Sequence, residues 1–167
     1  MCREDKILSA GKKTFYFFKS FQYNLVRFCN PISEQCLNIM KTKKTILVVD
    51  DEEQLCQTVA GELRREQYDV SEAYDGETAI ACINEHLPLS FDVVILDITM
   101  PGIDGLHVLD YLKKNHPSTK VIMVTGHSDF KSAIEAVKRG ADEFITKPYE
   151  FDTLFEAINK VLREEEE

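Results

Sequence analysis

The sequence contains no apolar segment long enough to cross a bilayer. Its longest aromatic run has four residues and ends at Lys19, which is also too short for the core of a signal peptide. The five cysteines form no C-x-x-C pair, so we expect reduced thiols and not a disulfide framework. We therefore expect a cytoplasmic protein without a transmembrane segment.

Positive charge is scarce in most of the chain. The net charge is −9, yet residues 1–44 hold nine Lys or Arg against three Asp or Glu, which leaves residues 45–167 at −15. A phosphate backbone is bound through a basic footprint. We therefore expect no direct nucleic-acid binding by this chain.

The opening segment differs in character from the rest. Residues 15–28 hold seven of the sixteen aromatic residues, at a spacing that would suit a basic amphipathic helix on a membrane surface or a partner. The simpler interpretation is that residues 1–39 are an upstream translation, a poorly ordered extension or a remnant of cloning, because Met40 directly precedes "KTKKTILVVDDE". We expect little stable packing in residues 1–43, an N-terminal extension that is poorly ordered or not native.

From Thr45 onward, short apolar runs alternate with amphipathic stretches of helical spacing. The runs predict five strands, at Thr45–Val49, Tyr68–Ala73, Phe91–Leu96, Lys120–Val124 and Glu143–Ile145. The amphipathic stretches predict five helices, at Glu53–Glu66, Gly76–Glu85 with Asp75 as N-cap, Gly105–Asn115, a stretch around Ile134 and Val137 that Ser128 or Asp129 caps and Gly140 ends, and Phe151–Arg163.

Strands that are apolar along their whole length are typical of sheets buried on both faces. With a helix after each strand, the pattern predicts an α/β fold: a doubly wound, five-stranded parallel sheet with helices on both faces and the flavodoxin-like strand order 2-1-3-4-5. We expect this domain to span residues 44–163, with an acidic tail at 164–167.

Polar side chains follow four of the predicted strands. Asp50 and Asp51 come after the first strand, Asp97 after the third, Thr125 after the fourth and Lys147 after the fifth. In open parallel sheets, ligands bind outside the carboxyl ends of the strands, so we expect these side chains to converge there. Each has a simpler explanation alone, such as helix capping or surface exposure, but their occurrence at four strand ends favours a site.

Carboxylates at close range repel each other unless a cation lies between them. Asp50, Asp51 and Asp97 suit Mg²⁺, which prefers oxygen ligands, with Mn²⁺ as an alternative. Zinc is disfavoured, because His127 is the only His or Cys at these strand ends. A screened carboxylate can act as a nucleophile toward a phosphoryl group, whose oxygens the hydroxyl and ammonium groups after the fourth and fifth strands would stabilise.

Four segments carry a specific resemblance to a known family. "LVVDDE", "ILDITMPGIDG", "VIMVTG" and "GADEFITKP" occur in order and at family-like spacing. They resemble the receiver domains of two-component response regulators, over about residues 44–163. The run "SDFKSAIEAVKRGADEFITKP" is similar to receivers attached to bacterial transcription regulators. The sequence leaves open whether the chain is a single-domain receiver or a piece of a larger regulator.

The resemblance implies a role for each site residue. Asp97 is then the phosphoacceptor, which takes its phosphoryl group from a phosphohistidine on a sensor histidine kinase or a histidine phosphotransfer protein. Asp50, Asp51 and Asp97 would hold the metal ion, with the backbone carbonyl of Thr99 as a further ligand. A receiver of this kind is a signalling domain, not an enzyme, and catalyses only its own phosphorylation and dephosphorylation.

The resemblance also implies a conformational switch. The phosphoryl group draws in the hydroxyl of Thr125, and Phe144 moves inward, which alters the face built from the last two strand-helix units. That face is a candidate homodimer surface. The family's frequent Tyr is replaced by Phe144, so a hydroxyl contribution is missing, while Thr99 and His127 would lie beside the phosphoryl group and influence its lifetime.

Three other classes share part of this pattern. A flavodoxin-type nucleotide binder needs an anion site at the first strand-helix turn, but that turn is acidic, and neither G-x-G-x-x-G nor G-x-x-x-x-G-K-[ST] occurs. An aspartate-nucleophile phosphatase would carry a second acid two residues after the nucleophile, where this chain has Thr99. An adaptor with a vestigial acidic pocket is the third alternative, which metal and phosphoryl-donor binding would distinguish.

Overall fold

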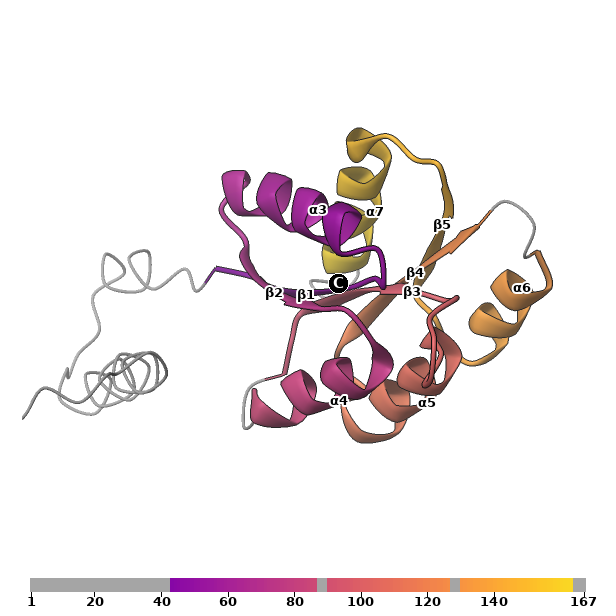
Figure 1. The fold of residues 1–167 in the computed structure, drawn as a ribbon. Helices are drawn as coiled ribbons and strands as arrows, with labels where there is room; N and C mark the ends of the chain where they lie inside the picture. Colours follow the sequence, from indigo (N-terminus) through magenta and orange to yellow (C-terminus); the bar gives the residue numbers. More distant parts are fainter. Residues whose placement is uncertain (1–42, 87–89, 127–129, 164–167) are drawn as a thin grey trace, which may run out of the picture. The chain divides into compact units, whose positions relative to one another are not determined.

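A computed structural model of the chain describes residues 43–86, 90–126 and 130–163, which Figure 1 shows in colour. The expectations for residues 1–42, for the tail at 164–167, for the caps Ser128 and Asp129 and for His127 fall outside this part of the chain.

Five strands form one sheet in the order β2-β1-β3-β4-β5, and every neighbouring pair is parallel. The strands are β1 (Thr45–Val49), β2 (Asp69–Ala73), β3 (Val93–Asp97), β4 (Lys120–Gly126) and β5 (Glu143–Lys147). The predicted strand order is therefore confirmed. The order reverses between β1 and β3, which makes the carboxyl ends of these two strands the expected place for a ligand.

Helices cover both faces of the sheet, as predicted (Figure 1). They are α3 (Glu53–Arg65), α4 (Gly76–Glu85), α5 (Gly105–Asn115), α6 (Phe130–Lys138) and α7 (Phe151–Arg163). Helices α3 and α7 share one apolar cluster with the sheet, and α4 and α5 share another, which Ala136 of α6 joins. The result is the three-layer arrangement of a doubly wound fold.

The strand β1 shows how one apolar run serves two cores. Ile46 and Val48 belong to the cluster under α3 and α7, whereas Leu47 and Val49 belong to the cluster under α4 and α5. Successive side chains of a strand point to opposite faces, so a strand covered on both faces must be apolar throughout.

Burial along almost the whole strand is found in the three inner strands. Strands β1, β3 and β4 are buried over almost their whole length, while β2 and β5 are partly exposed. The two partly exposed strands are the outer strands of the sheet, each with a single neighbour.

The strands continue beyond the apolar residues that predicted them. Asp97 is the last residue of β3, paired with Val124, and β4 and β5 run on to the pair Gly126 and Lys147. Ladder hydrogen bonds join backbone groups and place no demand on side-chain polarity. Asp97, Thr125 and Lys147 thus lie within the ends of strands, whereas Asp50 and Asp51 follow β1.

Capping residues fix where two of the helices begin. Asp75 accepts a hydrogen bond from the Thr78 amide at 2.6 Å at the start of α4, as expected of an N-cap. Asp104 accepts one from the His107 amide at 2.9 Å at the start of α5. After α6, Gly140 takes a φ of 90°, the left-handed conformation that ends helices.

The loop after β3 returns onto the strand end through Gly105, the first residue of α5. Its amide donates to the Ile98 carbonyl at 3.0 Å, and a Cβ atom added at this position would lie 2.1 Å from the carbonyl oxygen of Asp97. The start of α5 therefore lies against the backbone of Asp97, and only glycine allows this approach.

The substitution Gly105→Ala should lower the free energy of unfolding by about 1–3 kcal/mol or more, because the added methyl group meets backbone that cannot rotate away. Chemical denaturation measures the change. The control is Gly61→Ala in α3, where an added Cβ meets nothing within 4 Å. This substitution should stabilise the helix by up to about 1 kcal/mol. Equal stability of the Gly105→Ala variant and the wild type would contradict the close packing.

Candidate functional site

Three carboxylates lie together at the carboxyl end of the sheet. Asp50 directly follows β1 and Asp97 ends β3, and both are buried, whereas Asp51 is exposed to solvent. One carboxylate oxygen from each of the three lies within 4.8 Å of the others. The predicted convergence of these acids is therefore present in the structure.

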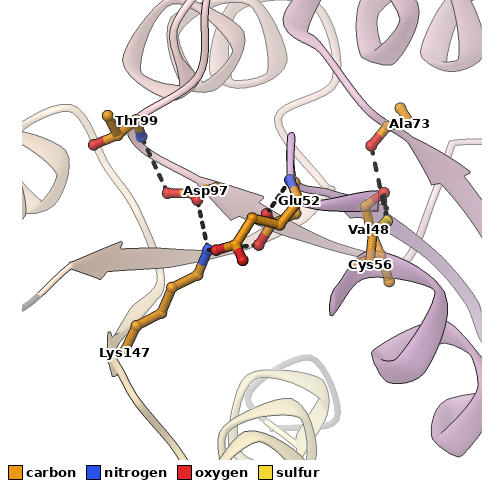
Figure 2. A network of polar contacts seen from close by, with 8 residues as sticks. Val48, Glu52, Cys56, Ala73, Asp97, Thr99 and Lys147 are labelled. Atoms are coloured by element: carbon orange, nitrogen blue, oxygen red, sulfur yellow. Dashed lines mark hydrogen bonds and ion pairs between the residues drawn. The ribbon is translucent and has the colours of Figure 1, made fainter. Parts of the chain in front are cut away.

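Lys147, the last residue of β5, reaches across to this cluster (Figure 2). Its Nζ donates to Oδ2 of Asp50 and to Oδ2 of Asp97, each at 2.7 Å. Both carboxylate side chains are only 7% exposed, and the lysine side chain is 18% exposed. The ammonium group thus bridges two carboxylates that would otherwise repel each other in a buried setting.

Backbone amides hold the other oxygens of the same two carboxylates. The Glu52 amide donates to Oδ1 of Asp50 at 2.9 Å, and the Thr99 amide donates to Oδ1 of Asp97 at 3.0 Å. In both cases the donor is the backbone amide two residues after the Asp, and this hydrogen bond closes a local turn that Asp side chains commonly form. In each carboxylate, a nearby backbone amide holds one oxygen and the Lys147 ammonium holds the other.

Burial and hydrogen bonding set the charge states of this group. Burial raises the pKa of the Asp97 carboxyl above its ordinary value, against the opposing effect of Lys147 and the Thr99 amide. Burial acts to lower the pKa of the Lys147 ammonium, but its hydrogen bonds to Asp50 and Asp97 outweigh burial and raise that pKa. Lys147 is therefore a permanent cation at neutral pH, and the charge of Asp97 depends on it.

The donor set fits a hard divalent cation. It consists of carboxylate oxygens alone, two of the three carboxylates are buried and preoriented, and Asp51 opens the cluster to solvent. Each carboxylate oxygen has two lone pairs, so the bonds to amides and to Lys147 leave acceptor sites for a metal ion. Asp50, Asp51 and Asp97 would hold such an ion, and oxygen ligands of this kind suit Mg²⁺.

The structure places Thr125 within β4 near its carboxyl end, fully enclosed by neighbours. Its hydroxyl donates to the Gly126 carbonyl at 3.4 Å and makes no hydrogen bond to Asp97. Thr125 thus stands at the expected strand end without joining the Lys147 network. The Thr99 carbonyl, expected as a metal ligand, likewise stays a prediction, because the observed contact of Thr99 with Asp97 is through its amide.

Phe144 lies in β5, with 43% of its surface exposed. The other large hydrophobic residues that are exposed in the described part of the chain are Ile134 at 46% and Val137 at 54%, both on α6. Large apolar side chains that are exposed can mark contact surfaces. These residues belong to the last two strand-helix units, where the resemblance to receiver domains implied a surface that changes.

Two further residues border the site without having been singled out from the sequence. Glu52 places Oε1 at 3.8 Å from Nζ of Lys147, and its side chain is 70% exposed. Tyr149 is partly buried against the core, and burial raises the pKa of its hydroxyl to about 12, which keeps it protonated. Only their closeness in sequence to Asp51 and Lys147 could have pointed to them.

Together, the fold and the site define a flavodoxin-like α/β domain with an acidic cluster at its switch point. The family model of the response regulator receiver domain matches residues 46–159. The chain belongs to this family of two-component signalling domains.

Curated relatives include transcription regulators. The chain is 40% identical over 119 residues to the nitrogen assimilation regulatory protein NtrX of Azorhizobium caulinodans, a match that covers 70% of this chain and 26% of that protein. It is 36% identical to the transcriptional regulatory protein ZraR of Salmonella typhimurium, over 74% of this chain and 27% of that protein. The chain thus spans about a quarter of the length of these relatives.

Solved structures give the same picture. The receiver domain of NtrX from Brucella abortus is similar with a TM-score of 0.65 and 41% identity, covering 71% of this chain and 98% of that one. A CheY-like receiver domain protein from Methanospirillum hungatei has a TM-score of 0.70 at 31% identity, over 75% and 98% of the two chains.

Among the described residues, no helix has both the length and the apolar character that spanning a membrane requires.

Replacing Lys147 with Met should lower the free energy of unfolding by about 3 kcal/mol in metal-free buffer, because two buried carboxylates then face each other without a cation. The loss should grow as the pH rises. Without Lys147 the pKa of Asp97 in the folded state lies further above its unfolded value, and such a group loses its stabilising contribution as the pH passes through the folded pKa.

Urea denaturation with a chelator, repeated across the acidic range, measures this effect. Lys114→Met is the matched control, since Lys114 is an exposed lysine on α5. Equal losses in the two variants at every pH would show that the Lys147 bridge does not support the carboxylates.

Proposed function

We propose that Asp97 accepts a phosphoryl group in a Mg²⁺-dependent reaction and that this modification switches the domain between two signalling states. The observation that carries the proposal is the position of Asp97. Its buried carboxylate lies at the end of β3, accepts a hydrogen bond from Lys147 and is grouped with two further acids. Membership of the receiver family supports the same reading.

The donor that we propose is a phosphohistidine on a sensor histidine kinase or a histidine phosphotransfer protein. An oxygen of Asp97 attacks the phosphorus atom, so that an O–P bond forms while the P–N bond breaks and the imidazole leaves with the bonding electrons. The backbone amide of Thr99 holds Oδ1 of Asp97 in place during this step. Positioning of this kind accounts for much of the catalysis of phosphoryl transfer.

Lys147 supplies positive charge where the phosphoryl oxygens arrive. Its ammonium lies 2.7 Å from Oδ2 of Asp97, so a small movement would bring it to an oxygen of the transferred group. The Thr125 hydroxyl would turn from the Gly126 carbonyl to another phosphoryl oxygen. A bound Mg²⁺ would supply the remaining neutralisation of phosphoryl charge from its place among Asp50, Asp51 and Asp97.

The consequence for signalling would lie in the last two strand-helix units. Turning Thr125 toward the phosphoryl group opens space inside the domain, and Phe144, half exposed on β5, would move inward to fill it. This movement would change the exposed surface around Phe144. We propose this surface as the contact for a homodimer or for an output element.

The wider role follows from the relatives. NtrX and ZraR are named as regulatory proteins, and the chain matches about a quarter of each. Any DNA binding in a full-length protein would therefore belong to parts beyond this receiver, whose residues 45–167 carry a net negative charge. A cytoplasmic location suits reduced cysteines such as Cys56 and Cys82, both free thiols.

The alternative functions differ in what becomes of the phosphoryl group. An aspartate-nucleophile phosphatase would turn over its substrate and needs an acid two residues after the nucleophile, where Thr99 stands. An adaptor with a vestigial pocket would bind neither metal nor phosphoryl group. No feature of the site favours either alternative over a phosphoacceptor.

Incubation with Mg²⁺ and a small phosphoryl donor should add one phosphoryl group to the wild-type chain, seen in its intact mass. The addition should be absent in Asp97→Asn, which lacks the nucleophilic oxygen, and when a chelator replaces Mg²⁺. Asp69→Asn is the control, because Asp69 is an exposed acid at the start of β2. No addition under any condition would refute the phosphoacceptor role and favour the adaptor.

Mg²⁺ should also raise the melting temperature of the wild-type chain, because a ligand that binds only the folded state stabilises it. At about 100 times its dissociation constant, Mg²⁺ would contribute about 2.7 kcal/mol. Asp51→Asn should lose most of this stabilisation, whereas Asp69→Asn should retain it. Equal stabilisation of wild type and Asp51→Asn would place the metal elsewhere.

A further inference from the structure

Glu52 lies beside Lys147 together with Asp50 and Asp97, and it differs from these two acids in its exposure. Its Oε1 lies 3.8 Å from Nζ of Lys147, and its side chain is 70% exposed, against 7% for Asp50 and Asp97. Figure 2 shows its carboxylate next to the lysine ammonium. The buried acids therefore contact the ammonium from within the domain, and Glu52 lies on its solvent side.

The side chain of Glu52 makes no capping hydrogen bond at the start of α3. Glu52 occupies the N-cap position of α3, where a side chain usually accepts a hydrogen bond from the first turn, yet it makes no such bond. Its backbone performs the structural work instead: its amide holds Oδ1 of Asp50, and its carbonyl accepts from the Cys56 amide at 2.9 Å. The carboxylate can therefore be neutralised without removing a cap.

Two electrostatic effects of this carboxylate act in the same direction. It attracts the Lys147 ammonium, which must turn toward the incoming phosphoryl oxygens for transfer to proceed. It also adds a negative charge on the solvent side of the site, which repels an anionic donor as it approaches. Both effects raise the barrier for phosphoryl transfer, and neither requires Glu52 to touch the reacting atoms.

We propose that Glu52 is a positioning residue that selects against small dianionic phosphoryl donors by its charge beside Lys147. This inference rests on the proposed function of Asp97. In the reaction with acetyl phosphate, an Asp97 oxygen forms a bond to phosphorus while the P–O bond breaks and acetate leaves with the electron pair. Glu52 slows the approach of the dianion and the turning of Lys147.

The experiment compares initial rates of phosphorylation of wild type, Glu52→Gln, Glu52→Asp and Glu53→Gln with saturating Mg²⁺. We expect Glu52→Gln to react with acetyl phosphate about two- to fivefold faster than wild type at low salt. Glu52→Asp keeps the charge and should stay close to the wild-type rate. Glu53→Gln removes the same charge one residue along, at the first position of α3, and should also stay close to wild type.

Two further readouts separate this role from a structural one. The rate gain of Glu52→Gln should shrink with phosphoramidate, a donor of lower negative charge. It should also shrink with rising salt, because at 0.1 M the Debye length that limits interactions between exposed charges is about 10 Å. Hydrolysis of the phosphorylated form should change little, since the attacking water is neutral.

The outcomes are distinct. A faster Glu52→Gln reaction that depends on salt and on donor charge supports the proposal. An unchanged or slower rate in Glu52→Gln, or an equal gain in Glu53→Gln, overturns it while leaving the phosphoacceptor role of Asp97 intact. Absence of phosphorylation in the wild type itself removes the proposed function and this inference together.

Discussion

The ammonium of Lys147 between Asp50 and Asp97 is the interaction on which the site depends. Two carboxylates buried at the ends of neighbouring strands repel each other, and the hydrophobic core beneath them offers no compensation. Lys147 supplies the missing charge from β5, the outer strand on the far side of β4. The geometry of the site therefore depends on the register of the sheet, because a shift of β5 would move the ammonium away from both acids.

Much of this arrangement follows from the sequence. The remaining parts could not be predicted, for physical reasons. The apolar runs predict the strands because burial on two faces excludes polar residues, and Asp50, Asp97 and Lys147 stand where such runs stop. The sequence cannot show that Asp97 still belongs to the β3 ladder, because backbone pairing leaves no mark on residue type. The Thr125 hydroxyl and the Glu52 carboxylate are oriented by local geometry, which side-chain identity does not determine.

Strand β5 carries both the cation of the site and one of the exposed large apolar side chains. Strand β5 ends in Lys147 and contains Phe144 three residues earlier, next to Met123 of β4. The ammonium and the aromatic ring are therefore carried by one five-residue strand. Because β5 is the outermost strand, it has a partner on one side only and can shift at a lower cost than β3 or β1.

The contact between Lys147 and Asp50 joins residues 97 positions apart in the chain. During synthesis both acids leave the ribosome long before the lysine, so an incomplete chain has the carboxylates without their cation. Contacts between residues so far apart in the sequence tend to slow folding, because a long loop must close before they form. The site is therefore complete only in a chain that extends through β5.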